Sequence, residues 1–224
     1  MTIRLGILAS GSGTNAQAMI DAARSGRLDA DIRIVLSNRP QAGVLLRAQE
    51  NGIAHACLDH EAFADRESYD SRLAGELLAA GVDTVALAGY MRMVSPVFLN
   101  AFPGRVLNIH PTLLPAFQGA HAVSKAWEYG VKFSGCTVHF VDAVLDGGPI
   151  IIQAVLPVRQ EEDERGMLDR LHVLEHRIYV QALQWLAEDR LRIDGRKVLL
   201  DPAGHPLSPQ PELALVWPPL EQGF

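Results

Sequence analysis

Apolar runs rich in β-branched residues alternate with helical patterns along most of this chain. The predicted strands are residues 3–9, 32–37, 84–88, 106–109, 134–141 and 150–155. The predicted helices are residues 15–25, 42–51, 66–80, 96–101, 122–129 and 163–188. Nearly continuous apolar strands separated by helices indicate a parallel sheet that is covered on both faces and joined by right-handed crossovers. We therefore predict an α/β fold with a doubly wound, mostly parallel sheet and a Rossmann-like N-terminal half.

The end of the chain departs from this alternation. Two short β-like pieces, residues 191–193 and 197–200, follow the last predicted helix, and a proline-rich stretch occupies residues 201–224. A chain of 224 residues is long enough to bury one full core. We predict a single domain over residues 1–200 and an irregular tail over residues 201–224 that lies on the surface.

Charge and composition exclude several classes of protein. The formal net charge of −6 argues against a nucleic-acid partner, because nonspecific binding to nucleic acid needs many lysine and arginine contacts to phosphates. No apolar run approaches the roughly 18 residues of a membrane span, and no signal-peptide pattern precedes the first strand. We expect a cytoplasmic protein with no membrane partner. The sequence does not distinguish a monomer from a homodimer.

The cysteine content gives no sign of a disulfide framework or a zinc site. Cys57 and Cys136 lie far apart and form no Cys-x-x-Cys pair. We expect both thiols to be buried as small apolar side chains.

The loop after the first strand has the composition of an anion site. Residues 10–15 read SGSGTN and lead directly into a predicted helix. Glycines let the backbone approach a ligand closely, and the free amides and positive dipole end of a helix N-terminus favour a phosphate. A plain turn with Thr14 or Asn15 as the helix cap also fits this pattern. Gly13, Thr14 and Asn15 are the candidate phosphate-binding residues.

A dinucleotide-binding fingerprint is the second functional interpretation of this loop. The glycines at 11 and 13 and the alanine at 16 match that pattern. The fingerprint also needs an acidic residue after the second strand to hold the ribose hydroxyls, and here the strand leads into Ser37, Asn38 and Arg39. A phosphate monoester therefore fits better than NAD, although Arg39 leaves NADP open.

Two polar side chains stand at the carboxyl end of an otherwise apolar strand. Asn108 and His110 are two residues apart, so they point to the same face, and Pro111 ends the strand. Both can donate hydrogen bonds to an oxygen that gains negative charge, as a carbonyl does under attack. Asp146, in a glycine-rich turn, could bond the imidazole, hold it charged and relay a proton. Taken singly, each of the three also fits a structural role in a turn or at a strand end.

Several segments of the chain resemble the formyltransferase family that uses 10-formyltetrahydrofolate. The resemblance rests on residues 107–115 (LNIHPTLLP), 117–119 (FQG) and 146–149 (DGGP). Within that family, residues 10–15, residues 87–92 (LAGYMR) and the pattern from Glu175 to Tyr179 are similar to the branch that formylates glycinamide ribonucleotide. The resemblance covers roughly residues 3–190 and leaves the tail unmatched.

This resemblance implies a role for each candidate residue. Asn108 is the donor to the oxyanion, His110 is the protonated acid, and Asp146 keeps the histidine charged and organises a water for proton transfer. Gly13, Thr14 and Asn15 hold the substrate phosphate. Glu175 contacts the ribose or glycinamide portion.

The resemblance also implies a set of folate-binding residues. They are Arg66, Met91, Arg92, Met93, Val94, Asn108, Val141, Asp142 and Asp146. Apolar side chains and backbone groups can enclose a pterin, and an arginine can meet carboxylates. Without the resemblance, Met91 and Met93 fit ordinary packing. Residues 120–125 agree only loosely with the family, so His121 fits a cap of the following helix as well as a ligand contact.

The function that these observations imply is transfer of the formyl group of 10-formyltetrahydrofolate to the amine of glycinamide ribonucleotide, a step of de novo purine biosynthesis. Neither a metal nor a redox cofactor is expected. Three alternatives stay open: a formyltransferase acting on initiator methionyl-tRNA, a 10-formyltetrahydrofolate hydrolase, and a nucleotide-binding or dehydrogenase-like domain. The first should carry a basic surface and an additional C-terminal domain, and the second an additional N-terminal regulatory domain.

Overall fold

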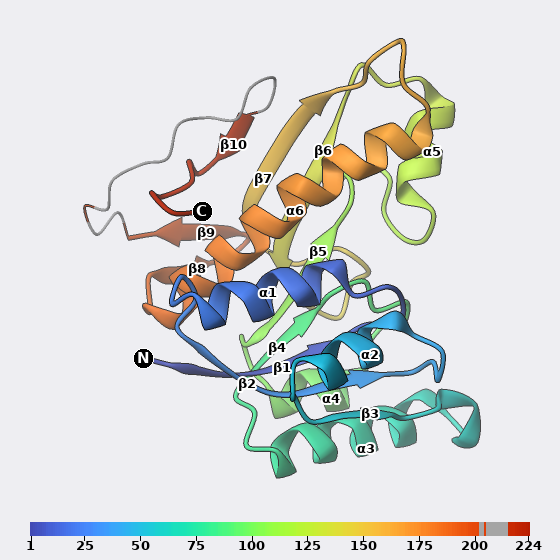
Figure 1. Cartoon of the computed structure of the whole chain (residues 1–224), viewed down its shortest axis with the longest axis vertical. Helices are drawn as coiled ribbons and strands as arrows, with labels where there is room; N and C mark the ends of the chain where they lie inside the picture. Colours follow the sequence, from blue (N-terminus) through green and yellow to red (C-terminus); the bar gives the residue numbers. More distant parts are fainter. Residues whose placement is uncertain (202–203, 205–214) are drawn as a thin grey trace.

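The computed structural model describes residues 1–201, 204 and 215–224, and within them one mixed sheet runs through the molecule (Figure 1). Its strands follow the order β3-β2-β1-β4-β5-β6-β7-β9-β8, with β10 also paired to β7. The strands are β1 (Ile3–Leu8), β2 (Ala30–Ser37), β3 (His55–Cys57), β4 (Thr84–Leu87), β5 (Val106–His110), β6 (Phe133–Phe140), β7 (Ile150–Pro157), β8 (Leu191–Asp194), β9 (Lys197–Leu200) and β10 (Leu215–Trp217). The helices are α1 (Thr14–Arg24), α2 (Gly43–Glu50), α3 (Arg66–Ala79), α4 (Pro96–Ala101), α5 (Ala122–Tyr129) and α6 (Glu164–Ala187), with a 3-10 turn at His60–Ala62.

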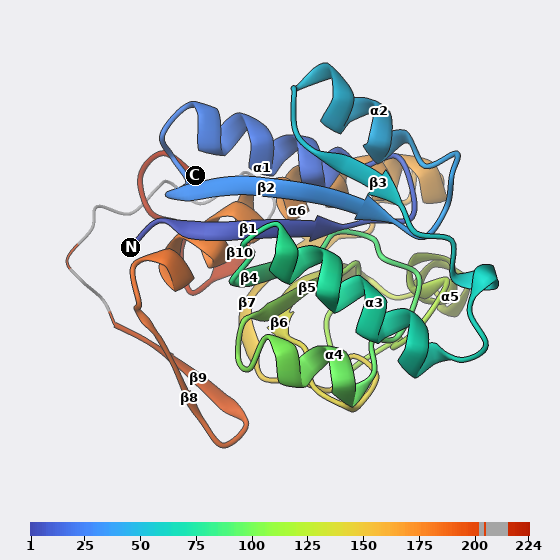
Figure 2. The same ribbon diagram turned by 90° about the horizontal axis from the view of Figure 1, so that it is seen from below.

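The N-terminal half is a doubly wound parallel sheet. Strands β3, β2, β1, β4 and β5 pair in parallel, with α1, α2 and α6 on one face and α3 and α4 on the other (Figure 2). Alternate residues of each strand enter different cores: Ala86 of β4 packs with the α1 and α6 side, and Val85 and Leu87 pack with the α3 and α4 side. The fold class predicted from the sequence is thus confirmed.

The C-terminal half of the sheet is largely antiparallel. Strand β6 pairs antiparallel with β5 and with β7. Helix α6 packs across β6 and β7. The predicted strands and helices are present with shifted ends, but β3 was not predicted. The three residues of β3 show no alternation of apolar and polar side chains, and all three are exposed. They form a strand because they pair in parallel with the edge strand β2.

The last ten residues contradict the expected irregular surface tail. Strand β10 pairs antiparallel with β7, and Val216 and Leu220 are buried in the core beside α6. The Arg190 guanidinium forms an ion pair with Glu221, with Nη2 2.7 Å from Oε1. This segment packs because the backbone of β10 pairs with the open edge of β7 while its apolar side chains are buried. Residues 202–203 and 205–214 of the expected tail lie outside the described residues, and the domain division at residue 200 stays a prediction.

The two cysteines differ in burial. Cys136 is buried in β6 as expected, whereas Cys57 is exposed in β3, so the expectation for Cys57 was wrong. All three side chains of the short edge strand β3 are exposed, so Cys57 lies in solvent with its neighbours. Among the described residues, no helix is long and apolar enough to cross a membrane.

The Arg190–Glu221 pair provides a test of the docked C-terminal segment. We expect Glu221→Ala to lower the free energy of unfolding by about 2–3 kcal/mol, because it removes one partner of a buried guanidinium. Urea denaturation measures the change. Glu128→Ala, at an exposed position on α5, is the matched control and should change stability by less than about 0.5 kcal/mol. Equal stability of the two variants would show that residues 215–224 do not depend on this pair.

Candidate functional site

A cavity of about 360 Å³ opens beyond the carboxyl ends of β4 and β5. Four segments line it: residues 89–94 after β4, residues 108–111 at the end of β5, residues 119–122 at the start of α5, and residues 141–146 after β6 with the exception of Ala143. The position is the one expected for ligands in an open α/β sheet. Leu87 and His139 complete the lining.

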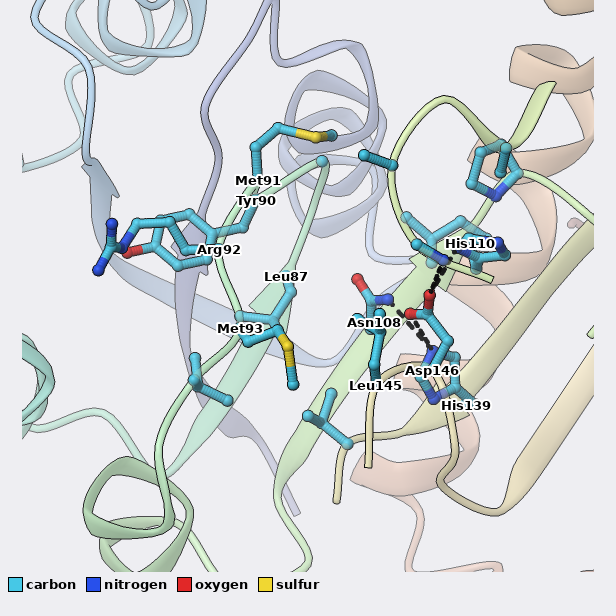
Figure 3. Close-up of a pocket in the computed structure, with 18 of the residues that line it drawn as sticks. Leu87, Tyr90, Met91, Arg92, Met93, Asn108, His110, His139, Leu145 and Asp146 are labelled. Atoms are coloured by element: carbon cyan, nitrogen blue, oxygen red, sulfur yellow. Dashed lines mark hydrogen bonds and ion pairs between the residues drawn. The ribbon is translucent and has the colours of Figure 1, made fainter. Parts of the chain in front are cut away.

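Most of the candidate residues meet at this cavity. Asn108, His110 and Asp146 line it, and so do the predicted folate contacts at residues 91–94, Val141 and Asp142 (Figure 3). His121 lines it as well, in a left-handed conformation with φ of 57° and without a side-chain capping bond. Arg66 is exposed at the start of α3 and is not part of the lining, so its role in folate binding stays a prediction.

His110 stands between two oxygen atoms that can only accept hydrogen bonds. Its Nε2 lies 2.9 Å from the carbonyl oxygen of Phe117, and its Nδ1 lies 3.4 Å from Oδ2 of Asp146. The side chains of His110 and Asp146 are 6% and 9% exposed, so little water screens the pair. Each ring nitrogen of His110 thus faces an oxygen atom to which it can donate a hydrogen bond when it carries a proton.

His139 is a site residue that the sequence did not reveal. It lies opposite Asn108 in the register of β5 and β6, and its side chain is 2% exposed. Its Nδ1 donates to the carbonyl oxygen of Phe140 at 2.8 Å, which leaves Nε2 as an acceptor in the neutral ring. Burial lowers the pKa of His139 and so favours that neutral form. Its place beside Asn108 follows only from the pairing of β5 with β6, which the sequence does not specify.

The neutral His139 ring orients the amide of Asn108. The Nδ2 atom of Asn108 lies 3.1 Å from Nε2 of His139, so one of its two N–H bonds is directed to the ring (Figure 3). No described residue accepts a hydrogen bond from the second N–H of the same nitrogen, which remains available to a ligand. His139 Nε2 also lies 3.8 Å from Oδ1 of Asp146, so this ring is adjacent to both predicted catalytic groups, Asn108 and Asp146.

The turn that carries Asp146 is held in an uncommon conformation. Asp146 has φ of 48°, a region that costs a non-glycine residue on the order of 1 kcal/mol. The backbone N–H of Gly119 donates to its Oδ2 at 2.8 Å and fixes the carboxylate. Gly148 allows the turn to close, because a Cβ atom there would lie 1.8 Å from the carbonyl oxygen of Phe140.

The glycine-rich loop joins β1 to α1 where the sequence placed it, and phosphate binding there stays a prediction. Gly13, with φ of 75°, is the N-cap of α1, and no side chain caps the helix, so neither Thr14 nor Asn15 has the capping role of the plain-turn alternative. A Cβ atom at Gly13 would lie 2.6 Å from the side chain of Val44, so this turn needs glycine. The uncapped amides at the start of α1 suit an anion.

Glu175 of α6 meets this loop from the opposite side. The Nδ2 atom of Asn15 donates to Oε2 of Glu175 at 2.8 Å, and the carboxylate is only 4% exposed. Burial raises the pKa of Glu175, while the Asn15 hydrogen bond and the positive charges of His172 and His110 oppose that rise. Asn15 and Glu175, which are 160 residues apart in sequence, thus form one polar cluster beside the helix N-terminus.

The raised pKa of Glu175 gives a prediction for stability. Above the unfolded pKa near 4.5 the unfolded chain ionises Glu175 more readily than the folded chain does, so the contribution of this residue to stability falls as pH rises. We expect Glu175→Gln to be more stable than the wild type by about 1 kcal/mol at about pH 8, because the buried charge is removed. The gain should shrink as the pH approaches about 4.5. Chemical denaturation at both pH values measures it, and a pH-independent difference would contradict the argument.

Comparison with known proteins identifies the family. The formyl transferase family model matches residues 3–183. The phosphoribosylglycinamide formyltransferase of Escherichia coli strain K12 is 42% identical over 204 residues, which cover 91% of this chain and 95% of that protein. The trifunctional purine biosynthetic protein adenosine-3 of Drosophila melanogaster is 45% identical over 185 residues, 82% of this chain but only 14% of the much longer relative.

A solved structure gives the same result. The crystal structure of glycinamide ribonucleotide transformylase 1 from Symbiobacterium toebii superposes with a TM-score of 0.87 at 49% identity and covers 89% of this chain and 94% of that one. The sequence match, the shared fold and the polar cluster at the end of β5 agree. The chain belongs to the formyl transferase family, in its phosphoribosylglycinamide formyltransferase branch.

Proposed function

We propose that this protein transfers the formyl group of 10-formyltetrahydrofolate to the amine of glycinamide ribonucleotide in de novo purine biosynthesis. The observation that carries the proposal is the convergence of Asn108, His110, His139 and Asp146 on one side of a cavity whose other side is formed by residues 89–94. The family of the chain and its full-length relatives support the same activity.

The cavity is suited to the folate. Met91 and Met93 are 61% and 42% exposed at its rim, where apolar side chains can enclose a pteridine. Arg92 lies with its guanidinium 4.9 Å from the centroid of the Tyr69 ring, on the side away from Asp146 (Figure 3). An arginine at that end can meet the carboxylates of the folate tail. Val141 and Asp142 border the pteridine end.

The amine substrate fits between the two polar clusters. Its phosphate binds the amides at Gly13, Thr14 and Asn15, and its ribose or glycinamide portion meets Glu175. A carboxylate can accept hydrogen bonds from two hydroxyl groups at once, which suits a ribose. The substrate amine then extends toward Asn108 and the formyl group.

The chemistry follows from the groups around the cavity. The neutral amine attacks the formyl carbon, a new carbon–nitrogen bond forms, and the carbonyl oxygen becomes negative. The second N–H of Asn108 donates to this oxygen, and the charged ring of His110 stabilises it at short range. The bond from carbon to the folate nitrogen then breaks, and Asp146 moves the proton lost by the amine to that nitrogen through water. This reaction needs no oxidant, and the expectation that no metal takes part stays a prediction.

An absorbance assay of 10-formyltetrahydrofolate consumption tests the activity. We expect consumption only when glycinamide ribonucleotide is present, because the amine is the attacking group. Asp146→Asn should lower kcat by about a hundredfold or more, the usual scale for an acid–base group. Equal consumption without the amine would instead indicate a hydrolase. Full activity of the Asn variant would remove Asp146 from the mechanism.

The orientation of Asn108 by His139 can be tested separately. We expect His139→Phe to lower kcat by about tenfold to a hundredfold, because the Asn108 amide loses the acceptor that aims its second N–H at the oxyanion. KM for both substrates should change by less than about threefold, since His139 contacts neither predicted ligand tail. His55→Phe, at an exposed position in β3, is the control. A kcat within about twofold of the wild type would contradict this role.

A further inference from the structure

Ser10 lies where the two central loops of the molecule separate. The backbone ladder between β1 and β4 continues past both strands: the Ala88 N–H donates to Leu8 O at 2.8 Å, and the Ser10 N–H donates to Gly89 O at 3.0 Å. Beyond this point residues 11–13 lead into α1 and residues 90–95 lead toward α4. The strand order reverses between β1 and β4, so Ser10 occupies the switch point of the parallel half.

The hydroxyl of Ser10 adds one more connection after the backbone ladder has ended. Its Oγ accepts a hydrogen bond from the Met91 N–H at 2.9 Å. It donates to Oδ1 of Asn38, at the end of β2, at 2.6 Å. The Asn38 amide oxygen can only accept a hydrogen bond, so the hydroxyl proton points to it, and a lone pair of the same hydroxyl accepts the Met91 N–H. The Ser10 hydroxyl is therefore donor and acceptor at once in a single side-chain rotamer.

The surroundings of this hydroxyl exclude water. Ser10 is 4% exposed and Asn38 is 3% exposed. Loss of a partner would leave a buried donor or acceptor unsatisfied, so these hydrogen bonds hold the loops to this arrangement. Ser10 also begins the glycine-rich phosphate loop, while Met91 begins the exposed rim of the folate cavity.

We propose that Ser10 is a positioning residue that holds the folate loop, residues 89–94, in register with the phosphate loop, residues 10–15. This role rests on the proposed function, because it is the two substrates on these loops that must meet. This role does not require the hydroxyl to contact the formyl carbon or the amine. It fixes the separation of the two loops that carry them, and an error of about 1 Å in that separation can cost a hundredfold in rate.

Ser10→Ala is the direct test, and Ser134→Ala is its matched control. Ser134 is a serine of β6 that is likewise buried, at 3% exposure, but its Oγ has no hydrogen-bond partner among the described residues. Both changes remove one buried oxygen atom, and only the first removes hydrogen bonds. We expect Ser10→Ala to lower kcat by about tenfold or more while KM for each substrate stays within about threefold. Ser134→Ala should keep kcat within about twofold.

Amide hydrogen exchange provides a readout that is independent of activity. The Met91 amide should exchange about tenfold faster or more in Ser10→Ala than in the wild type, because its acceptor is lost, and it should be unchanged in Ser134→Ala. Asn38→Ala leaves the Met91 bond in place but frees the hydroxyl to rotate, so we expect a smaller loss of kcat. The double variant should be no slower than Ser10→Ala alone, since both changes act on one network.

The outcomes separate this inference from the proposed function. Unchanged Met91 exchange in Ser10→Ala, or kcat within about twofold of the wild type, would overturn the positioning role. A loss of kcat accompanied by an equal rise in both KM values and a lower Tm would also overturn it, because general structural damage would then suffice. If the wild type transfers no formyl group to glycinamide ribonucleotide, the proposed function fails, whereas the exchange result still reports on the link between the loops.

Discussion

The register of β5 with its two neighbours is the constraint on which the candidate site depends. On its parallel side Asn108 lies opposite Leu87 of β4, and on its antiparallel side it lies opposite His139 of β6. A shift of one residue in either pairing would turn Asn108 and His110 to the other face of the sheet. The hydroxyl of Tyr179, on α6, helps to fix this register, because its single proton is shared between the carbonyl oxygens of Leu87 and Leu107, at 3.1 and 2.9 Å from the hydroxyl oxygen.

Burial of the polar groups makes their arrangement specific. The side chains of His110, His139 and Asp146 are all less than a tenth exposed, so each must find its partners within the protein. Backbone groups supply several of them: the carbonyls of Phe117 and Phe140 accept from the two imidazoles, and the Gly119 N–H donates to Asp146. This network offsets the cost of the left-handed conformation at Asp146 and leaves one N–H of Asn108 for a ligand.

Helix α6 adds a second polar cluster to the candidate site. It packs on α1 along one face of the sheet, and this contact brings Glu175 to Asn15 at the start of α1. The same helix is covered at its far end by residues 215–224, where Gln181 accepts from the Glu221 N–H at 2.9 Å. The C-terminal segment therefore supports the helix that presents Glu175, although it lies apart from the cavity.

The sequence by itself determined the alternation of strands and helices, the glycine-rich loop after β1 and the polar pair at the end of β5, because strand and helix periods and turn residues are local properties. It also placed Asp146 in a glycine-rich turn. Only the tertiary structure decided that His139 faces Asn108, that Glu175 meets Asn15, that β3 forms and that residues 215–224 add a strand. Each of these depends on which strands or helices become neighbours. Burial and strand pairing over the whole fold decide which elements become neighbours, and this cannot be recognised from the pattern of apolar residues in any one segment.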